Sequence, residues 1–243
     1  LKAYLESDES GIRDHAKSIR YTYNITPQIY QKDDDGYKQV NPYSTLSSFG
    51  GGMSSIYSMG AMSMSITEFF HEMPEDDSLY RSQYEIKAGR WPENYNEIVL
   101  VLTENGLVSD LALYAMDLKD DTDLEEAVKA YMAGEEAEPT EEEPLATFNY
   151  EDFIGITFKL IHGSDCYSYD PQYKVWTSKL DNKSFMDDLV KNGEDLTIVG
   201  VIQPSEDANG QMLSTGINYP YSLTSHIIEY AAKSDIVKAQ LDN

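Results

Sequence analysis

The histidines are the residues in this chain best suited to bind a metal ion or transfer a proton. There are four of them, His15, His71, His162 and His226. No two lie four residues apart, and the sequence has no His-Glu-x-x-His motif, so a helix-borne zinc site is not indicated. We therefore expect single histidines that are hydrogen-bonded or exposed, and we predict no metal ligands.

The stretch His162-Gly163-Ser164-Asp165-Cys166 places the residue types of a nucleophilic site side by side. Catalytic triads form by convergence from distant chain positions, so adjacency in the sequence is no evidence for one. We interpret Cys166 as a small residue packed beside Tyr167, not as a nucleophile. Among 43 aspartates and glutamates some carboxylates must lie close together, and none is predicted to be a general acid or base.

Motifs that bind cofactors are absent from the sequence. The triple glycine Gly50-Gly51-Gly52 is not followed by Lys and Ser or Thr, so it is not a phosphate-binding loop. An EF-hand alignment through Gly36 puts Pro42 where the bidentate glutamate is needed. The motifs G-x-S-x-G, G-x-G-x-x-G and C-x-x-C do not occur. We predict a protein that is not an enzyme, with no catalytic or cofactor-binding residues and no cofactor.

The composition indicates an acidic globular protein. Its 243 residues are 41% hydrophobic, enough for one large domain or two coupled subdomains. The formal net charge of −25 repels phosphate backbones, which excludes nucleic acid as a partner. Residues 117–143 hold twelve acidic and two basic residues, and we predict a solvated acidic loop there; the alternative is a cation-binding or partner-binding tail. The single cysteine excludes an intrachain disulfide.

Hydrophobic periodicity predicts an α+β fold with helices at both ends. Residues 44–65 are rich in Ser, Gly and Met without a period, which predicts a mobile loop. The predicted helices cover residues 10–19, 122–134, 185–193 and 222–241, and the predicted strands cover residues 21–25, 28–31, 37–40, 84–88, 97–102, 154–160, 173–177 and 196–202.

Local signals set several of these boundaries. Asp35-Gly36 predicts a hairpin between its two flanking strands. A left-handed cap at Gly193 is expected to end one helix, and Pro204 to stop the strand over 196–202. The strand over 154–160 is expected to pair with residues 173–177.

The chain has no predicted membrane span. Its longest aliphatic run, residues 98–102, is too short to cross a bilayer, and no charged-then-apolar leader precedes the first acidic cluster. We therefore expect a fragment of a longer protein, without that protein's targeting or membrane segments.

Two neighbouring segments share a recognisable order of elements. Residues 83–92 read QYEIKAGRWP and residues 96–101 read NEIVLV, a strand, a Gly-Arg-x-Pro turn and a Glu-Ile-Val strand. This order resembles the core extracytoplasmic domain of MacB/FtsX-type ABC transporter permeases. Residues 19–30, 113–116, 197–202 and 220–224 are similar to the large-domain variants of Firmicutes, so the resemblance covers most of the chain in order.

The resemblance implies a MacB-like fold, a mixed α/β porter-type subdomain with a second subdomain inserted in it. Residues 1–243 would form a single extracytoplasmic domain. Its porter-like core would comprise residues 1–100 and 195–243, and the inserted subdomain residues 101–194, with an acidic linker at 133–145. The acidic stretch departs from compact family members.

The resemblance also implies a non-enzymatic role in the cell membrane. The domain would lie on the extracytoplasmic side and couple motion of transmembrane helices to a substrate or partner, for export or mechanotransmission. Implied partners are a cognate ATPase subunit that hydrolyses ATP, a second permease copy or paralogue, and a peptide, lipid or cell-envelope component. The alternative is a secreted or lipid-anchored ligand-binding protein. A hypothetical partner-contact region is the Gly- and Met-rich segment over residues 49–64.

Overall fold

The structure is a computed structural model, and its fold is mixed α+β. The structure describes residues 2–23, 25–33, 36–40, 70–108, 110–118, 148–208 and 210–242. Within these ranges one sheet has the order β2-β1-β6-β9-β5-β10-β3, and β4 also pairs with β9. Its strands are β1 (Gln28–Asp33), β2 (Gly36–Gln39), β3 (Phe70–Glu72), β4 (Tyr84–Gly89), β5 (Glu97–Val101), β6 (Thr157–Ile161), β9 (Glu194–Pro204) and β10 (Gly216–Tyr219).

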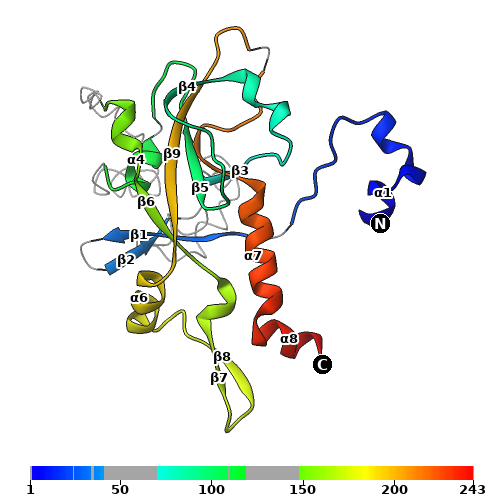
Figure 1. The fold of residues 1–243 in the computed structure, drawn as a ribbon. Coiled ribbons are helices and arrows are strands. Elements are labelled where there is room, and N and C mark those ends of the chain that lie inside the picture. Colours follow the sequence, from blue (N-terminus) through cyan, green and yellow to red (C-terminus); the bar gives the residue numbers. More distant parts are fainter. Residues whose placement is uncertain are drawn as a thin grey trace, which may run out of the picture.

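The helices lie around this sheet (Figure 1). They are α1 (Lys2–Glu6), α4 (Asp110–Ala115), α6 (Lys183–Lys191), α7 (Tyr221–Lys233) and α8 (Asp235–Leu241), and short 3-10 turns cover Asp8–Ser10, Ile12–Asp14, Asp77–Leu79, Arg81–Gln83, Tyr150–Phe153 and Gly163–Cys166. The N-terminal segment with α1 stands away from the sheet, whereas α7 runs beside it toward α8. A separate hairpin of β7 (Tyr167–Asp170) and β8 (Val175–Ser178) projects at the end near α8.

Strand β9 connects the two halves of the sheet. On one side its first residues pair with β6, from Glu194 opposite Leu160 to Thr197 opposite Thr157. Its second half pairs on that side with β4, and β5 runs parallel along the other side. The β-branched residues between positions 197 and 202 favour this long strand, and Pro204 is its last residue.

The core lies on both faces of strand β5. Ile98 and Leu100 belong to the larger core cluster, together with Leu196 and Ile198 of β9. Val99 and its neighbour Val101 face the other side, where they pack with Met73, Tyr80, Tyr84, Ile202 and Leu213. Because successive side chains alternate across a strand, an unbroken apolar run here means burial on both faces.

Several sequence predictions are confirmed. The fold is α+β, with strands at 84–89, 97–101 and 194–204 close to the predicted ranges. Strands β1 and β2 form the predicted antiparallel hairpin, with Gly36 at a φ of 135°. Helices α7 and α8 cover most of residues 222–241 and meet at Ser234, as the capping signal indicated.

The predicted helix over residues 10–19 is wrong. Only the 3-10 turn Ile12–Asp14 forms there, and Gly11 before it has a left-handed φ of 62°. Ala16 and Ile19 are only partly buried, so little apolar burial supports a longer helix. The predicted strand over 21–25 is also wrong in its described part, residues 21–23 and 25.

Two pairing and capping predictions are wrong as well. Strand β6 pairs with β1 and β9, and the segment expected beside it forms β8, which pairs with β7. Helix α6 ends at Lys191 and is capped by Asn192 with a φ of −94°, and Gly193 is not left-handed. Glycine is needed at 193 for another reason, because a Cβ there would lie 2.6 Å from the Leu160 carbonyl oxygen.

Some predictions fall outside the described residues. These are the mobile loop over 44–65 with the segment 49–64, the helix over 122–134 and the acidic linker over 133–145. The division into subdomains 1–100 plus 195–243 and 101–194 stays a prediction. None of the helices in the described part of the chain is both long enough and apolar enough to cross a membrane.

Candidate functional site

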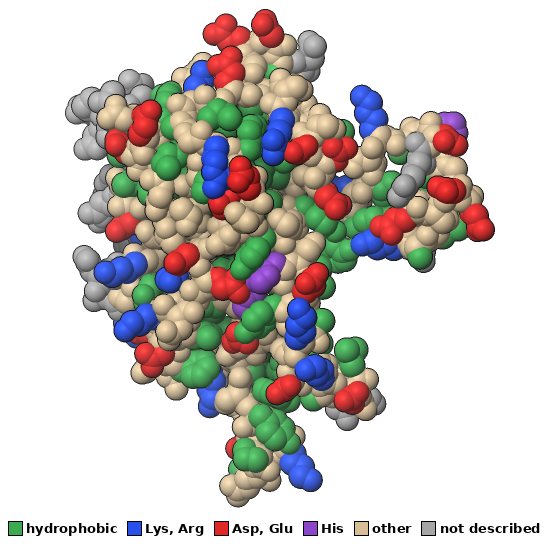
Figure 2. Space-filling view, viewed as in Figure 1, with side chains coloured by type: hydrophobic (Ala, Val, Ile, Leu, Met, Phe, Trp, Pro, Cys, Tyr) green, Lys and Arg blue, Asp and Glu red, His purple; other side chains and the backbone are tan. Residues whose placement is uncertain are grey.

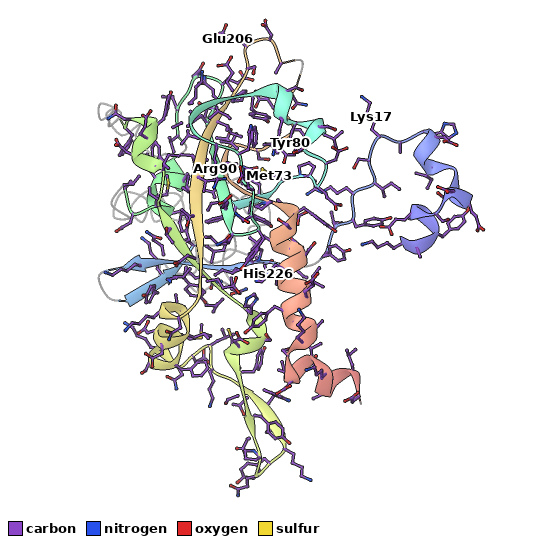
Figure 3. All side chains as sticks on the ribbon, in the orientation of Figure 1. Lys17, Met73, Tyr80, Arg90, Glu206 and His226 are labelled. Atoms are coloured by element: carbon purple, nitrogen blue, oxygen red, sulfur yellow. The ribbon has the colours of Figure 1, made fainter. Side chains whose placement is uncertain are left out.

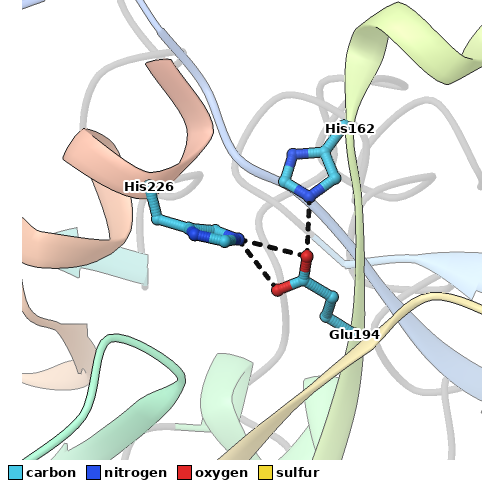
Figure 4. Close-up of side chains that lie close together, drawn as sticks. All are labelled: His162, Glu194 and His226. Atoms are coloured by element: carbon cyan, nitrogen blue, oxygen red, sulfur yellow. Dashed lines mark hydrogen bonds and ion pairs between the residues drawn. The ribbon is translucent and has the colours of Figure 1, made fainter. Parts of the chain in front are cut away.

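Two histidines and a tyrosine converge on the carboxylate of Glu194, and Figure 4 shows the two histidines around it. The Nε2 atom of His162 lies 2.9 Å from Oε1. The Nε2 atom of His226 lies 3.1 Å from Oε1 and 3.0 Å from Oε2. The hydroxyl of Tyr95 donates a hydrogen bond to Oε2 at 2.9 Å. Three side chains from distant parts of the chain therefore meet at one carboxylate.

Regular elements position these side chains. Glu194 is the first residue of β9 and is opposite Leu160 of β6. His162 follows β6 and precedes the 3-10 turn Gly163–Cys166, so the β6–β9 pairing brings it to Glu194. His226 lies in the second turn of α7, and Figure 3 shows it where the helix passes the sheet.

Aromatic rings hold both imidazoles. Tyr95 stacks on His226 with ring centroids 3.9 Å apart and an interplanar angle of 20°. Tyr230 stacks on His162 at 3.5 Å and 8°. Tyr230 lies one helical turn after His226 on α7, and its hydroxyl donates to Asp165 at 2.8 Å. Stacking and hydrogen bonding together fix the orientation of each imidazole.

The electrostatics of the cluster favour an ionised carboxylate. Burial raises the pKa of Glu194, but hydrogen bonds from His162, His226 and Tyr95 outweigh it and lower the pKa overall. The hydrogen bond to Asp165, together with burial, raises the pKa of Tyr230 to about 12. At neutral pH Glu194 is therefore ionised and the hydroxyl of Tyr230 is protonated.

The cluster is open to solvent on one side. The side chain of His162 is 5% exposed, whereas those of Glu194 and His226 are 31% and 27% exposed. Figure 2 shows histidine side chains at the middle of this face, between acidic and apolar ones. The Nδ1 atom of His162 is buried and has no hydrogen-bond partner among the described residues. Small ions and water can therefore approach Glu194 and His226.

Cys166 ends the sequence stretch that has catalytic residue types. Cys166 is buried with Tyr30, Ile161 and Val190, as predicted for a packed residue. Burial, with a smaller contribution from Asp165, raises the pKa of its thiol, which disfavours the thiolate.

Sequence reasoning missed the cluster because it searched for ligands close together in sequence. His162 and His226 each lie 32 residues from Glu194. The other histidines take no part, since His15 is exposed in the N-terminal segment and His71 is in β3. The one local signal was the spacing of His226 and Tyr230 on the predicted last helix.

A second carboxylate closes the turn between β4 and β5. Glu97 accepts two hydrogen bonds from the Arg90 guanidinium, at 2.8 and 2.6 Å, and one from the backbone N–H of Glu93 at 2.7 Å. The Arg90 guanidinium, with the backbone amides of Glu93 and Asn94, holds the pKa of Glu97 well below its usual range. Within the turn the backbone passes close to β9, since a Cβ on Gly89 or on Gly200 would lie 2.1 Å from a carbonyl oxygen.

Comparison of the chain with protein-family models, with curated proteins and with solved structures finds no match.

Proposed function

We propose that the chain is the extracytoplasmic domain of a MacB/FtsX-type ABC transporter permease. It is a non-enzymatic module of a cell-membrane protein, and it passes motion of the transmembrane helices to a substrate or partner outside the cell. The mixed sheet is then the porter-type part of a MacB-like fold. ATP is hydrolysed on a separate ATPase subunit or domain.

The observation that carries this proposal is the convergence of the segments that resemble the family. Residues 197–202 are about 100 positions from the neighbouring segments 83–92 and 96–101, yet their strand β9 is hydrogen-bonded to both β4 and β5. The Gly-Arg-x-Pro turn and the glutamate of the Glu-Ile-Val strand are joined by the Arg90–Glu97 ion pair. The shared sequence pattern thus corresponds to one interlocked structural unit.

Two further segments of the resemblance pack on the same unit. From the segment 113–116, Leu113 lies in α4 and Met116 directly follows this helix. Both belong to the same core cluster as Ile98. Leu223, near the start of α7, belongs to it as well and is fully buried. Packing of α7 on the sheet gives a route by which movement of the chain beyond α8 reaches β9 and β5. The proposed partners are an ATPase, a second permease copy or paralogue, and a peptide, lipid or envelope component.

Cysteine labelling of the full-length parent protein in intact cells tests the proposal. Cys166 is buried, so this domain gives a low background with a membrane-impermeant maleimide. Tyr173, 69% exposed at the β7–β8 hairpin, is the site for a Tyr173→Cys label. We expect labelling in intact cells, with the protein in carbonate-washed membranes and co-purified with an ATPase subunit.

Other outcomes contradict the proposal. A Tyr173→Cys protein that reacts only after cell lysis overturns it. Labelling in intact cells with release from washed membranes supports the secreted ligand-binding protein instead. Labelling in intact cells of a protein that is held in the membrane only by a single N-terminal lipid anchor supports the lipid-anchored form of that alternative.

A further inference from the structure

The His162, Glu194 and His226 cluster has a use that does not depend on the proposed membrane function. We propose that these three side chains bind a divalent transition-metal ion of the zinc class. The ligands are the Nε2 atoms of the two imidazoles and a carboxylate oxygen. Their candidate ligand atoms all lie within 4.8 Å of one another.

The spacing of the donors suits such an ion. The two imidazole nitrogens lie 2.9 and 3.1 Å from Oε1 of Glu194. Zinc binds imidazole nitrogen and carboxylate oxygen at about 2.0–2.2 Å, which places neighbouring tetrahedral ligands about 3.3 Å apart. Bonds to one ion can therefore replace the hydrogen bonds after small shifts of these side chains.

The chemistry of the donors selects the class of metal. Two imidazoles and one carboxylate form the three-ligand set of open zinc sites, in which water completes the coordination. Calcium and magnesium prefer oxygen ligands alone, so we expect them to bind weakly here. The exposed sides of Glu194 and His226 leave room for the water.

Most of the site is ordered before an ion arrives. The rings of Tyr95 and Tyr230 hold His226 and His162 in place, and the Tyr95 hydroxyl orients the Glu194 carboxylate. Such outer contacts tune metal sites by fixing the ligands. The net charge of −25 also attracts cations to the protein.

One feature of His162 limits the affinity. An ionised Glu194 can only accept a hydrogen bond, so in the metal-free protein the Nε2 atom of His162, 2.9 Å away, is the donor. Metal binding moves this proton to Nδ1, which has no acceptor among the described residues. Loss of such an outer partner weakens metal binding by about 10–100-fold. We therefore expect a dissociation constant near the micromolar range.

A metal ion bound to the cluster would join three elements of the fold. His162 follows β6, Glu194 begins β9 and His226 is in α7. An ion bound to all three ties α7 to the sheet and stabilises the folded state by mass action. At zinc concentrations about 100-fold above the dissociation constant, the melting temperature should rise by about 5–10 °C.

The test uses the 243-residue chain after removal of metals with EDTA. Calorimetric titration with Zn²⁺ measures affinity and stoichiometry, and the visible absorption of bound Co²⁺ reports nitrogen and oxygen coordination. Two variants remove a ligand. Glu194→Gln keeps the shape of the side chain, and His226→Phe keeps a ring against Tyr95. His15→Phe is the matched control, because His15 is an exposed histidine outside the cluster.

We expect one equivalent of Zn²⁺ in the parent chain and in His15→Phe, with the thermal shift. Glu194→Gln and His226→Phe should bind at least about 100-fold more weakly and lose the Co²⁺ spectrum. Circular dichroism in EDTA establishes that both variants fold. The proposal is overturned if the folded variants bind Zn²⁺ as tightly as the parent, if the parent binds none, or if Mg²⁺ gives the same shift.

Discussion

Two glutamates begin neighbouring parallel strands and differ in what surrounds them. Glu97 of β5 is bound by Arg90 and by amides of residues 93 and 94, all within seven positions of it. Glu194 of β9 is bound by two histidines 32 residues away and a tyrosine 99 residues away. A guanidinium is permanently charged, whereas imidazoles exchange protons and metals near neutral pH. The first carboxylate closes a turn, and the second forms a site whose partners can be exchanged.

The largest expected effect concerns the close backbone contact beside Glu97. A Cβ at Gly200 would lie 2.1 Å from the Arg90 carbonyl oxygen, whereas one at Gly210 meets no atom within 4 Å. Gly200→Ala should lower the free energy of unfolding by about 3 kcal/mol or more, because backbone must move. Urea denaturation measures this against Gly210→Ala, which should change stability by less than about 0.5 kcal/mol. Equal effects would show that the turn is not tightly packed on β9.

Exchanging each carboxylate for an amide compares the two sites directly. Glu97→Gln cannot satisfy both the guanidinium and the two backbone amides, and it should cost about 2 kcal/mol. Glu194→Gln keeps an oxygen that accepts from a histidine and from Tyr95, and in EDTA it should cost less than about 1 kcal/mol. Urea denaturation of both variants measures the difference. A larger loss for Glu194→Gln would reverse the assignment of roles.

The same contrast explains which parts the sequence predicts. The strands around Gly89-Arg90-Trp91-Pro92 follow from local patterns, apolar runs on either side of a turn, and both are where they were expected. The Glu194 cluster depends on the pairing of β6 with β9 and on the docking of α7, and that pairing was predicted wrongly. Ring stacking across three elements leaves no pattern at a fixed spacing.

Failures of local prediction have a physical cause too. Residues 10–19 have a helical spacing of apolar residues, but Ile12, Ala16 and Ile19 are only partly buried. Helices of this length are marginal in water unless an apolar face is packed. The glycine at 193 was expected as a helix cap, yet its role is to admit the carbonyl of Leu160.

The pH dependence of folding stability tests the role of Glu97. Its pKa is lowered in the folded protein, so its contribution to stability is complete above the unfolded value of about 4.3 and is lost as pH falls toward the folded value. The stability difference between the parent and Glu97→Gln should be constant from about pH 6 to 8 and shrink below about pH 4.3. Urea midpoints measured across this range check it. A difference that instead shrinks near pH 6.5 would point to a histidine.

The smallest expected effect is on stability, from removing the hydroxyl of Tyr95 while its ring is kept. Tyr95→Phe keeps the stack on His226 and removes the hydrogen bond to Glu194, which water can partly replace because that carboxylate is 31% exposed. Stability in EDTA should fall by about 0.5 kcal/mol. Tyr230→Phe is the matched change at the other ring, since its hydroxyl bonds Asp165 and not the carboxylate. If Tyr95 orients a metal ligand, Tyr95→Phe weakens Zn²⁺ binding about 10-fold while Tyr230→Phe leaves it unchanged; equal weakening by both would mean that ring packing alone shapes the site.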